Sequence, residues 1–217
     1  MNTQSFLTAV GLLALAGSSP APAATLPAPT VEYSADRIME TDQGTFEGKV
    51  YSAKDKERSE THLQGMQTVM ILRRDRQVGW TLMPTQKMYR QMDLAKAAEQ
   101  SASVPQDVVD ITEEGPESVE GHAATKYKMV MKDRSAGGLI WITAEGIPVK
   151  MDMLSKSGSA RTRVTVTLKN LQIGPQDPQL FEVPEGYSAL PASGRFGFGF
   201  GKGLGGALQS VLPGGDQ

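Results

Sequence analysis

The chain has 217 residues, no cysteine, and 22 Lys and Arg against 24 Asp and Glu, for a net charge of −2 at pH 7. The absence of cysteine excludes a disulfide scaffold, thiolate chemistry and a lipid-modified cysteine. The balanced charge gives no reason to expect a nucleic-acid partner, for which a concentrated basic face would be needed.

The first 23 residues have the organisation of a signal peptide. Residues 6–16 form an uncharged apolar run that is shorter than the ~18–20 residues of a membrane-spanning helix. Ala21-Pro22-Ala23 then supplies a small-residue cleavage site. We therefore predict cleavage near Ala23 and a periplasmic or secreted protein whose contact with membranes is at most peripheral. Residues 1–4 lack the Lys or Arg that usually precedes the apolar run of a signal peptide. The alternative interpretation of this apolar run is a buried N-terminal helix.

Short alternating runs separated by turn residues fill the sequence from residue 31 to residue 174, as is typical of an antiparallel β-sheet. In the clearest run, Tyr127, Met129 and Met131 alternate with mostly polar neighbours, so one face is apolar and the other faces water. The expected strands span residues 31–41, 44–52, 58–63, 66–74, 77–84, 87–93, 123–132, 138–143, 148–155 and 160–173.

A sheet with one apolar face must cover that face by curling, by a second layer or by a helix. The best helix candidate is residues 93–100, with Asp93 as its N-cap, and we predict that it forms a lid. Residues 101–121 mix Pro, Glu and Ser, which predicts an acidic connection of low order. A single helical turn is expected near residues 178–181.

The end of the chain, residues 192–217, is rich in glycine, with Phe196, Phe198 and Phe200 at alternate positions. This composition predicts a disordered tail. The tail is either a flexible end without a task or an aromatic segment that contacts a partner or a membrane surface. The expected organisation is thus a signal peptide (1–23), one domain (24–191) and a tail (192–217).

Catalytic and metal-binding constellations are missing from the sequence. The two histidines, His62 and His122, lie outside any nucleophile motif, so neither is expected to act as a catalytic base. Two isolated histidines and no cysteine are too few ligands for a zinc site. The acidic residues Glu113, Glu114, Glu117 and Glu120 lack the spacing of a calcium loop. We expect no enzyme activity, no metal and no cofactor.

Methionine is the unusual residue of this sequence. Ten methionines follow the initiator, and Met-x-Met occurs at residues 129–131 and 151–153. The expected strands contain Met66, Met70, Met83, Met88, Met92, Met129, Met131, Met151 and Met153. A methionine-rich surface can adapt to ligands of variable shape. Ordinary filling of the core and a thioether copper site remain as the two other interpretations.

Several segments, in their order and spacing, resemble the superfamily of the lipoprotein carrier LolA, and most closely an exported family of unknown function. The resemblance covers residues 31–187. It depends on Glu57-Arg58-Ser59-Glu60 before Gly65, Val69-Met70-Ile71-Leu72-Arg73-Arg74-Asp75, Trp80-Thr81-Leu82-Met83-Pro84-Thr85-Gln86-Lys87-Met88-Tyr89, Trp141-Ile142-Thr143 before Ile147-Pro148-Val149-Lys150, Leu171-Gln172-Ile173-Gly174, and Asp177-Pro178-Gln179-Leu180-Phe181-Glu182-Val183-Pro184-Glu185-Gly186-Tyr187.

This resemblance implies a mainly β fold: a strongly curved antiparallel sheet, or half-open β-barrel, with one or two short helices over a concave apolar face that accepts acyl chains. In the carrier, that cavity shields the lipid of a lipoprotein. Four prolines, at positions 20, 22, 27 and 29, leave no room here for the carrier's N-terminal lid helix, and no carrier residue is transferred to this chain.

The resulting hypothesis is a non-catalytic periplasmic binding protein that holds a lipid, acyl chain or other hydrophobic ligand in a concave apolar cavity and takes part in the handling of envelope lipids or lipoproteins. The alternative is an envelope interaction module with a filled core, whose partner is another envelope protein. The residues expected to line the cavity are Met70, Leu72, Trp80, Leu82, Met129, Met131, Met151, Met153, Val164 and Val166.

Overall fold

The computed structural model describes residues 26–63, 65–101, 109–158 and 160–190. In this part of the chain twelve strands form one sheet, in the order β12-β6-β5-β4-β3-β2-β1-β11-β10-β9-β8-β7. Every neighbouring pair is antiparallel except the parallel pair of β12 with β6. The strands are β1 (Tyr33–Thr41), β2 (Gly44–Ala53), β3 (Lys56–Leu63), β4 (Met66–Arg73), β5 (Val78–Met83), β6 (Met88–Asp93), β7 (Val109–Val119), β8 (His122–Met131), β9 (Ala136–Ile142), β10 (Pro148–Ser157), β11 (Ala160–Ile173) and β12 (Ser188–Ala189).

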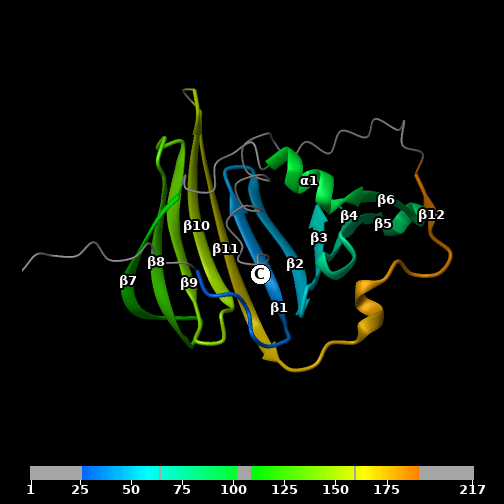
Figure 1. Cartoon of the computed structure of the whole chain (residues 1–217), viewed down its shortest axis with the longest axis horizontal. Helices are drawn as coiled ribbons and strands as arrows, with labels where there is room; N and C mark the ends of the chain where they lie inside the picture. The colour runs from blue at the N-terminus through cyan, green and yellow to red at the C-terminus, as the bar shows by residue number, and fades with distance from the viewer. Residues whose placement is uncertain (1–25, 64, 102–108, 159, 191–217) are drawn as a thin grey trace, which may run out of the picture.

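The sheet is strongly curved and stays open between its edge strands β7 and β12 (Figure 1). The expected mainly β fold, with one strongly curved and open antiparallel sheet and little helix, is confirmed. Helical structure among the described residues is limited to α1 (Leu94–Ser101) and three short 3-10 turns: η1 (Arg74–Arg76), η2 (Pro84–Gln86) and η4 (Pro178–Phe181). The predicted signal peptide (1–23) and tail (192–217) lie outside the described residues.

The local predictions hold for the ten expected strands and for the helix. Asp93 caps α1 by accepting a hydrogen bond from the backbone N–H of Lys96 at 3.1 Å. The prediction of a low-order connection over residues 101–121 is wrong for its second half, which forms the edge strand β7. This strand tolerates Pro116 and exposed acidic residues because an edge strand leaves half of its backbone groups unpaired in the sheet.

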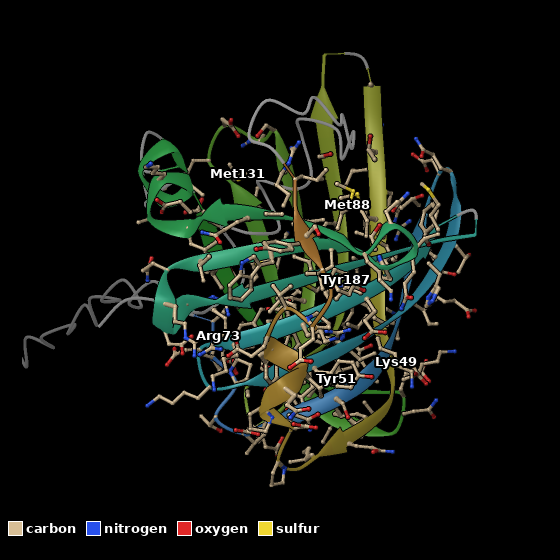
Figure 2. The ribbon with its side chains drawn as sticks, turned by 90° about the vertical axis from the view of Figure 1, so that its right-hand side faces the viewer. Lys49, Tyr51, Arg73, Met88, Met131 and Tyr187 are labelled. Carbon is tan, nitrogen blue, oxygen red and sulfur yellow. The ribbon has the colours of Figure 1, made fainter. Side chains whose placement is uncertain are left out.

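Two walls rise from a floor made of β1, β2, β3 and β11. One wall, the β4–β6 wall, consists of β4, β5 and β6; the other, the β8–β10 wall, consists of β8, β9 and β10. Figure 1 shows the walls on either side of the floor, with α1 at the upper end of the β4–β6 wall. In Figure 2 the strands of the β4–β6 wall cross in front of β10 and β11, so the two walls face each other.

The C-terminal segment from Gly174 to Leu190 packs against the outside of the β4–β6 wall, as Figure 2 shows. Asp177 starts η4 by accepting a hydrogen bond from the backbone N–H of Gln179 at 2.9 Å. The turn places Phe181, which is 1% exposed, against Val69, Ile71 and Leu82. This segment therefore covers one face of that wall.

An ion cluster fastens the same segment. Arg73 is buried, with 4% of its surface exposed. Its guanidinium donates hydrogen bonds to both carboxylate oxygens of Asp75, at 2.8 and 2.7 Å, and to Glu182. Arg76 binds the second Glu182 oxygen at 3.1 Å. The hydrogen bonds that Arg73 donates, first to Asp75 and then to Glu182, outweigh burial and raise the pKa of Arg73 well above its ordinary value. The cluster joins β4 to the C-terminal segment.

The described residues before β1 are extended and contain no helix, as the prolines at positions 27 and 29 predict. The backbone N–H of Thr30 donates to the Glu145 carbonyl at 2.9 Å. Gly146 has φ +83°, and a Cβ there would lie 2.0 Å from the Ala28 carbonyl oxygen. Glycine is therefore needed where the N-terminal segment crosses the end of β9.

Candidate functional site

Strand register divides the side chains of the sheet between two faces, because directly paired residues point to the same side. Met39 pairs with Phe46 of β2 and with Val166 of β11. The row continues through Met151 of β10 to Ile140 of β9. We call the face that carries this row the inner face.

The inner face is the concave one. On the β4–β6 wall it is opposite the face covered by the C-terminal segment, which lies outside the barrel in Figure 2. On the other side of the floor, the inner face carries a buried cluster of Tyr127, Met129, Ile140, Ile142, Met151 and Met153, against which Leu26 packs.

Every methionine except the initiator points to the inner face. The chain has 11 methionines, and register places the other ten on this face of the sheet. They are Met39 on β1, Met66 and Met70 on β4, Met83 on β5, Met88 and Met92 on β6, Met129 and Met131 on β8, and Met151 and Met153 on β10. The two walls thus face each other with thioether side chains.

The covered face of the β4–β6 wall has a different composition. Its core, which we call the outer core, consists of Val69, Ile71, Leu82 and Phe181. The partly buried residues packed against it are Tyr51, Ala53, Trp80, Tyr89, Leu180 and Tyr187. Within this described cluster no methionine is present, and the side chains are branched or aromatic apart from Ala53.

Eight of the ten residues predicted to line the cavity lie on the inner face: Met70, Leu72, Met129, Met131, Met151, Met153, Val164 and Val166. The other two, Trp80 and Leu82, point the opposite way into the outer core, which corrects the expectation that they face the cavity. Apolar residues occupy both faces of β5, so the alternation of apolar and polar residues could not show which side chains of this strand point inward. Whether the eight inner-face residues bind a ligand stays a prediction.

A small polar group on the floor was missed by the sequence reasoning. Arg37 of β1 lies on the inner face and donates to the Thr61 hydroxyl of β3 at 3.0 Å. Tyr33, two residues earlier on the same face, is 5% exposed and hydrogen-bonded to the Ser52 side chain. Burial, followed by the nearby Glu57 carboxylate, raises the pKa of Tyr33, so its hydroxyl keeps its proton.

The outer face of the β8–β10 wall is charged. Trp141 is held there with the ammonium groups of Lys126 and Lys150 at 5.7 and 5.0 Å from its ring centre. Two hollows of about 460 and 500 Å³ lie on this side, lined by Lys128, Val130 and Arg134 among others. Both are open. The first is lined mainly by charged and polar side chains, whereas the second is largely apolar, with Leu139 and Leu154 in its lining.

Other kinds of site find little support in the described residues. Among them, no group of three or more His, Asp or Glu side chains could hold a metal ion. His62 is exposed on β3. Within residues 26–63, 65–101, 109–158 and 160–190, no helix is both long and apolar enough to cross a bilayer.

Comparisons with known proteins place this geometry in context. The model of a family described as a domain of unknown function, DUF4412, matches residues 37–145, which is half of the chain. This match confirms the resemblance to a family of unknown function. No curated protein matches the sequence significantly.

Among solved structures, an uncharacterized conserved protein from Thermus thermophilus aligns with a TM-score of 0.53 at 11% identity, covering 74% of this chain and 90% of that one. The MucA/MucB complex of Pseudomonas aeruginosa aligns with a TM-score of 0.46 at 17% identity, over 70% of this chain and 56% of that one. The Mycobacterium tuberculosis lipoprotein LppX aligns with a TM-score of 0.41 at 12% identity, over 66% and 88%. At such identities the first of these likenesses shows the fold alone.

Proposed function

We propose, from the premise that the chain belongs to DUF4412, a family of domains of unknown function, that the protein is a non-catalytic binding protein. Its ligand is an acyl chain or another hydrophobic group held against the inner face. The signal-peptide pattern of residues 1–23 supports a periplasmic or secreted location. In that compartment the protein would handle envelope lipids or lipoproteins.

The distribution of methionine carries this proposal. If methionine served only to fill space, both buried faces of the β4–β6 wall would contain it. The outer core instead uses branched and aromatic side chains, and all ten methionines after the initiator lie on the inner face. Methionine is unbranched and polarizable, so it adapts to a ligand of variable shape.

Exposure supports the same proposal. On the β4–β6 wall the outer-core residues Val69, Ile71 and Leu82 are at most 1% exposed, whereas Met66 is 49% exposed and its inner-face neighbours Met70, Met83 and Met88 are only partly buried. An apolar surface that the described residues leave partly uncovered gains free energy when a ligand covers it. Each buried methylene contributes about 0.8 kcal/mol, so a chain of about ten carbons gives roughly 8 kcal/mol before ordering costs.

Native mass spectrometry tests the proposal directly. Protein purified from its own envelope should carry a co-purifying lipid or acylated species, and delipidated protein should gain thermal stability when medium-chain alcohols or lipids are added. Protein that emerges without ligand, and whose melting temperature no amphiphile changes, would show that the inner face is closed and filled.

A pair of variants localises the binding. Met70→Gln together with Met88→Gln keeps the side-chain length but makes the partly buried inner face polar, and should weaken alkyl-chain binding about tenfold or more. Leu154→Gln is the matched control, because Leu154 is a 40% exposed apolar residue on the outer face of β10. Equal losses in both variants would contradict binding at the inner face.

A further inference from the structure

Arg37 stands out on the inner face because of where it lies. Among the described strands, the inner face carries four charged side chains: Arg37, Glu57, Arg90 and Glu113. Arg90 and Glu113 are exposed, on β6 near one edge of the sheet and on the edge strand β7. Arg37 is on β1, in the middle of the sheet, with Leu168 beside it on β11 and Gly48 on β2.

The hydrogen bonding of Arg37 is incomplete. A guanidinium has five N–H donors, yet within the part of the chain that the structure describes, the Arg37 side chain makes one hydrogen bond, to the neutral Thr61 hydroxyl. The nearby Glu57 carboxylate contacts the Arg74 guanidinium instead, at 3.4 Å. These three ionic groups together carry a net charge of +1.

Arg73 shows how the same chain satisfies a structural arginine. Its buried guanidinium binds two carboxylates, Asp75 through both oxygens and Glu182. Arg37 has no such carboxylate partner among the described residues, although burial opposes its charge and lowers its pKa. An arginine kept charged beside apolar side chains, with donors left over, is suited to bind an anion in bidentate fashion.

We infer that Arg37 binds the anionic head group, a carboxylate or a phosphate, of a long-chain amphiphile. The Thr61 hydroxyl and the protonated Tyr33 hydroxyl lie on the same floor and offer further hydrogen bonds to that head group. The alkyl tail then lies along the partly buried methionines of the β4–β6 wall. This inference rests on the proposed function and specifies its ligand class as acidic amphiphiles.

Competition binding against a neutral fluorescent dye tests the inference with three ligands of equal chain length: dodecanoate, dodecyl phosphate and dodecanol. The wild-type chain should bind at least one of the two anions about tenfold or more tightly than the alcohol, because hydrogen bonds between charged groups exceed neutral ones. The anion with the larger advantage identifies the head group.

Arg37→Met should remove that advantage and lower anion affinity about tenfold, to the level of dodecanol. Arg163→Met is the matched control: Arg163 lies on the outer face, pairs with Asp152 at 2.8 Å, and its loss should change neither affinity. If Arg37→Met fails to fold, Arg37→Lys keeps the charge without the bidentate geometry and should retain only part of the preference.

Three results would overturn the inference. Equal affinity of the wild-type chain for all three ligands would mean that the protein binds alkyl chains but that Arg37 does not recognise the head group. A preference for anions that persists in Arg37→Met would lead to the same conclusion. Wild-type protein that binds none of the three ligands would overturn the proposed function together with the inference.

Discussion

The β4–β6 wall has two faces that are built from the same six-to-eight-residue strands but differ in composition. Its outer face packs Val69, Ile71 and Leu82 against Phe181 and is closed by the chain's own C-terminal segment. Its inner face carries Met70, Met83 and Met88 and is only partly buried. Branched and aromatic side chains have few rotamers and suit a fixed partner, whereas methionine suits a variable one. A single sheet in this protein therefore carries a permanently packed core on one face and an adaptable surface on the other.

The largest expected effect comes from breaking the permanent core. Phe181→Ala removes a 1% exposed ring from the outer core and should lower the free energy of unfolding by about 3–5 kcal/mol. Met88→Ala, on the inner face of the same wall, should cost only about 1 kcal/mol because that side chain is already partly exposed. Urea denaturation of both variants measures the difference, and similar losses would mean that the two faces are packed alike.

The ion cluster over the outer core gives a smaller, pH-dependent effect. The hydrogen bond from Arg73, opposed by burial, lowers the pKa of Asp75. The folded state therefore binds fewer protons than the unfolded state near the ordinary Asp pKa of about 4. The resulting stability is fully present above that pH and is lost as the pH falls through the lower folded pKa.

Asp75→Asn should cost about 1 kcal/mol at pH 7, since the carboxylate is partly exposed, and should flatten the decline in stability below about pH 4. Thermal melts across pH 3–7 measure it. Asp110→Asn serves as the control, because that carboxylate is exposed on the edge strand β7, away from the cluster. An unchanged acid profile in Asp75→Asn would show that the ion pair of Asp75 with Arg73 does not contribute to the pH dependence of stability.

The smallest effect on stability is expected where the surface is adaptable. Met70→Leu with Met83→Leu should change the free energy of unfolding by about 1 kcal/mol or less, because volume is conserved at partly exposed positions. The same double variant should narrow the range of alkyl chain lengths that bind, since leucine is less flexible than methionine. A series of n-alkanols measures that range; an unchanged range would remove the argument from side-chain adaptability.

Much of the fold could be read from the sequence because β alternation and turn chemistry are local. The alternation of Tyr127, Met129 and Met131 correctly predicted strand β8, and Asp93 correctly predicted the start of α1. β7 was missed because Gly115, Pro116 and the surrounding acidic residues have low strand propensity. Its stability comes from pairing with β8, which no local pattern shows.

The candidate site was only partly predictable. The methionines and valines of β8, β10 and β11 were placed correctly because their strands alternate cleanly, whereas Trp80 and Leu82 of β5 were placed on the wrong face. Arg37 gave no local signal at all. Apolar and polar residues alternate only weakly around Arg37 in β1. The interactions that distinguish Arg37, its hydrogen bond to Thr61 and the nearby charge of Glu57, both involve residues of β3.

The sequence by itself determined that the chain forms strands, that most of them have one apolar side, and that methionine is concentrated in them. Only the tertiary structure decided which side is concave, that all ten methionines after the initiator share it, and that Arg37 lies on that side in the middle of the sheet. The physical reason is that alternation arises within a strand, while register and curvature arise from pairing between residues far apart in the chain.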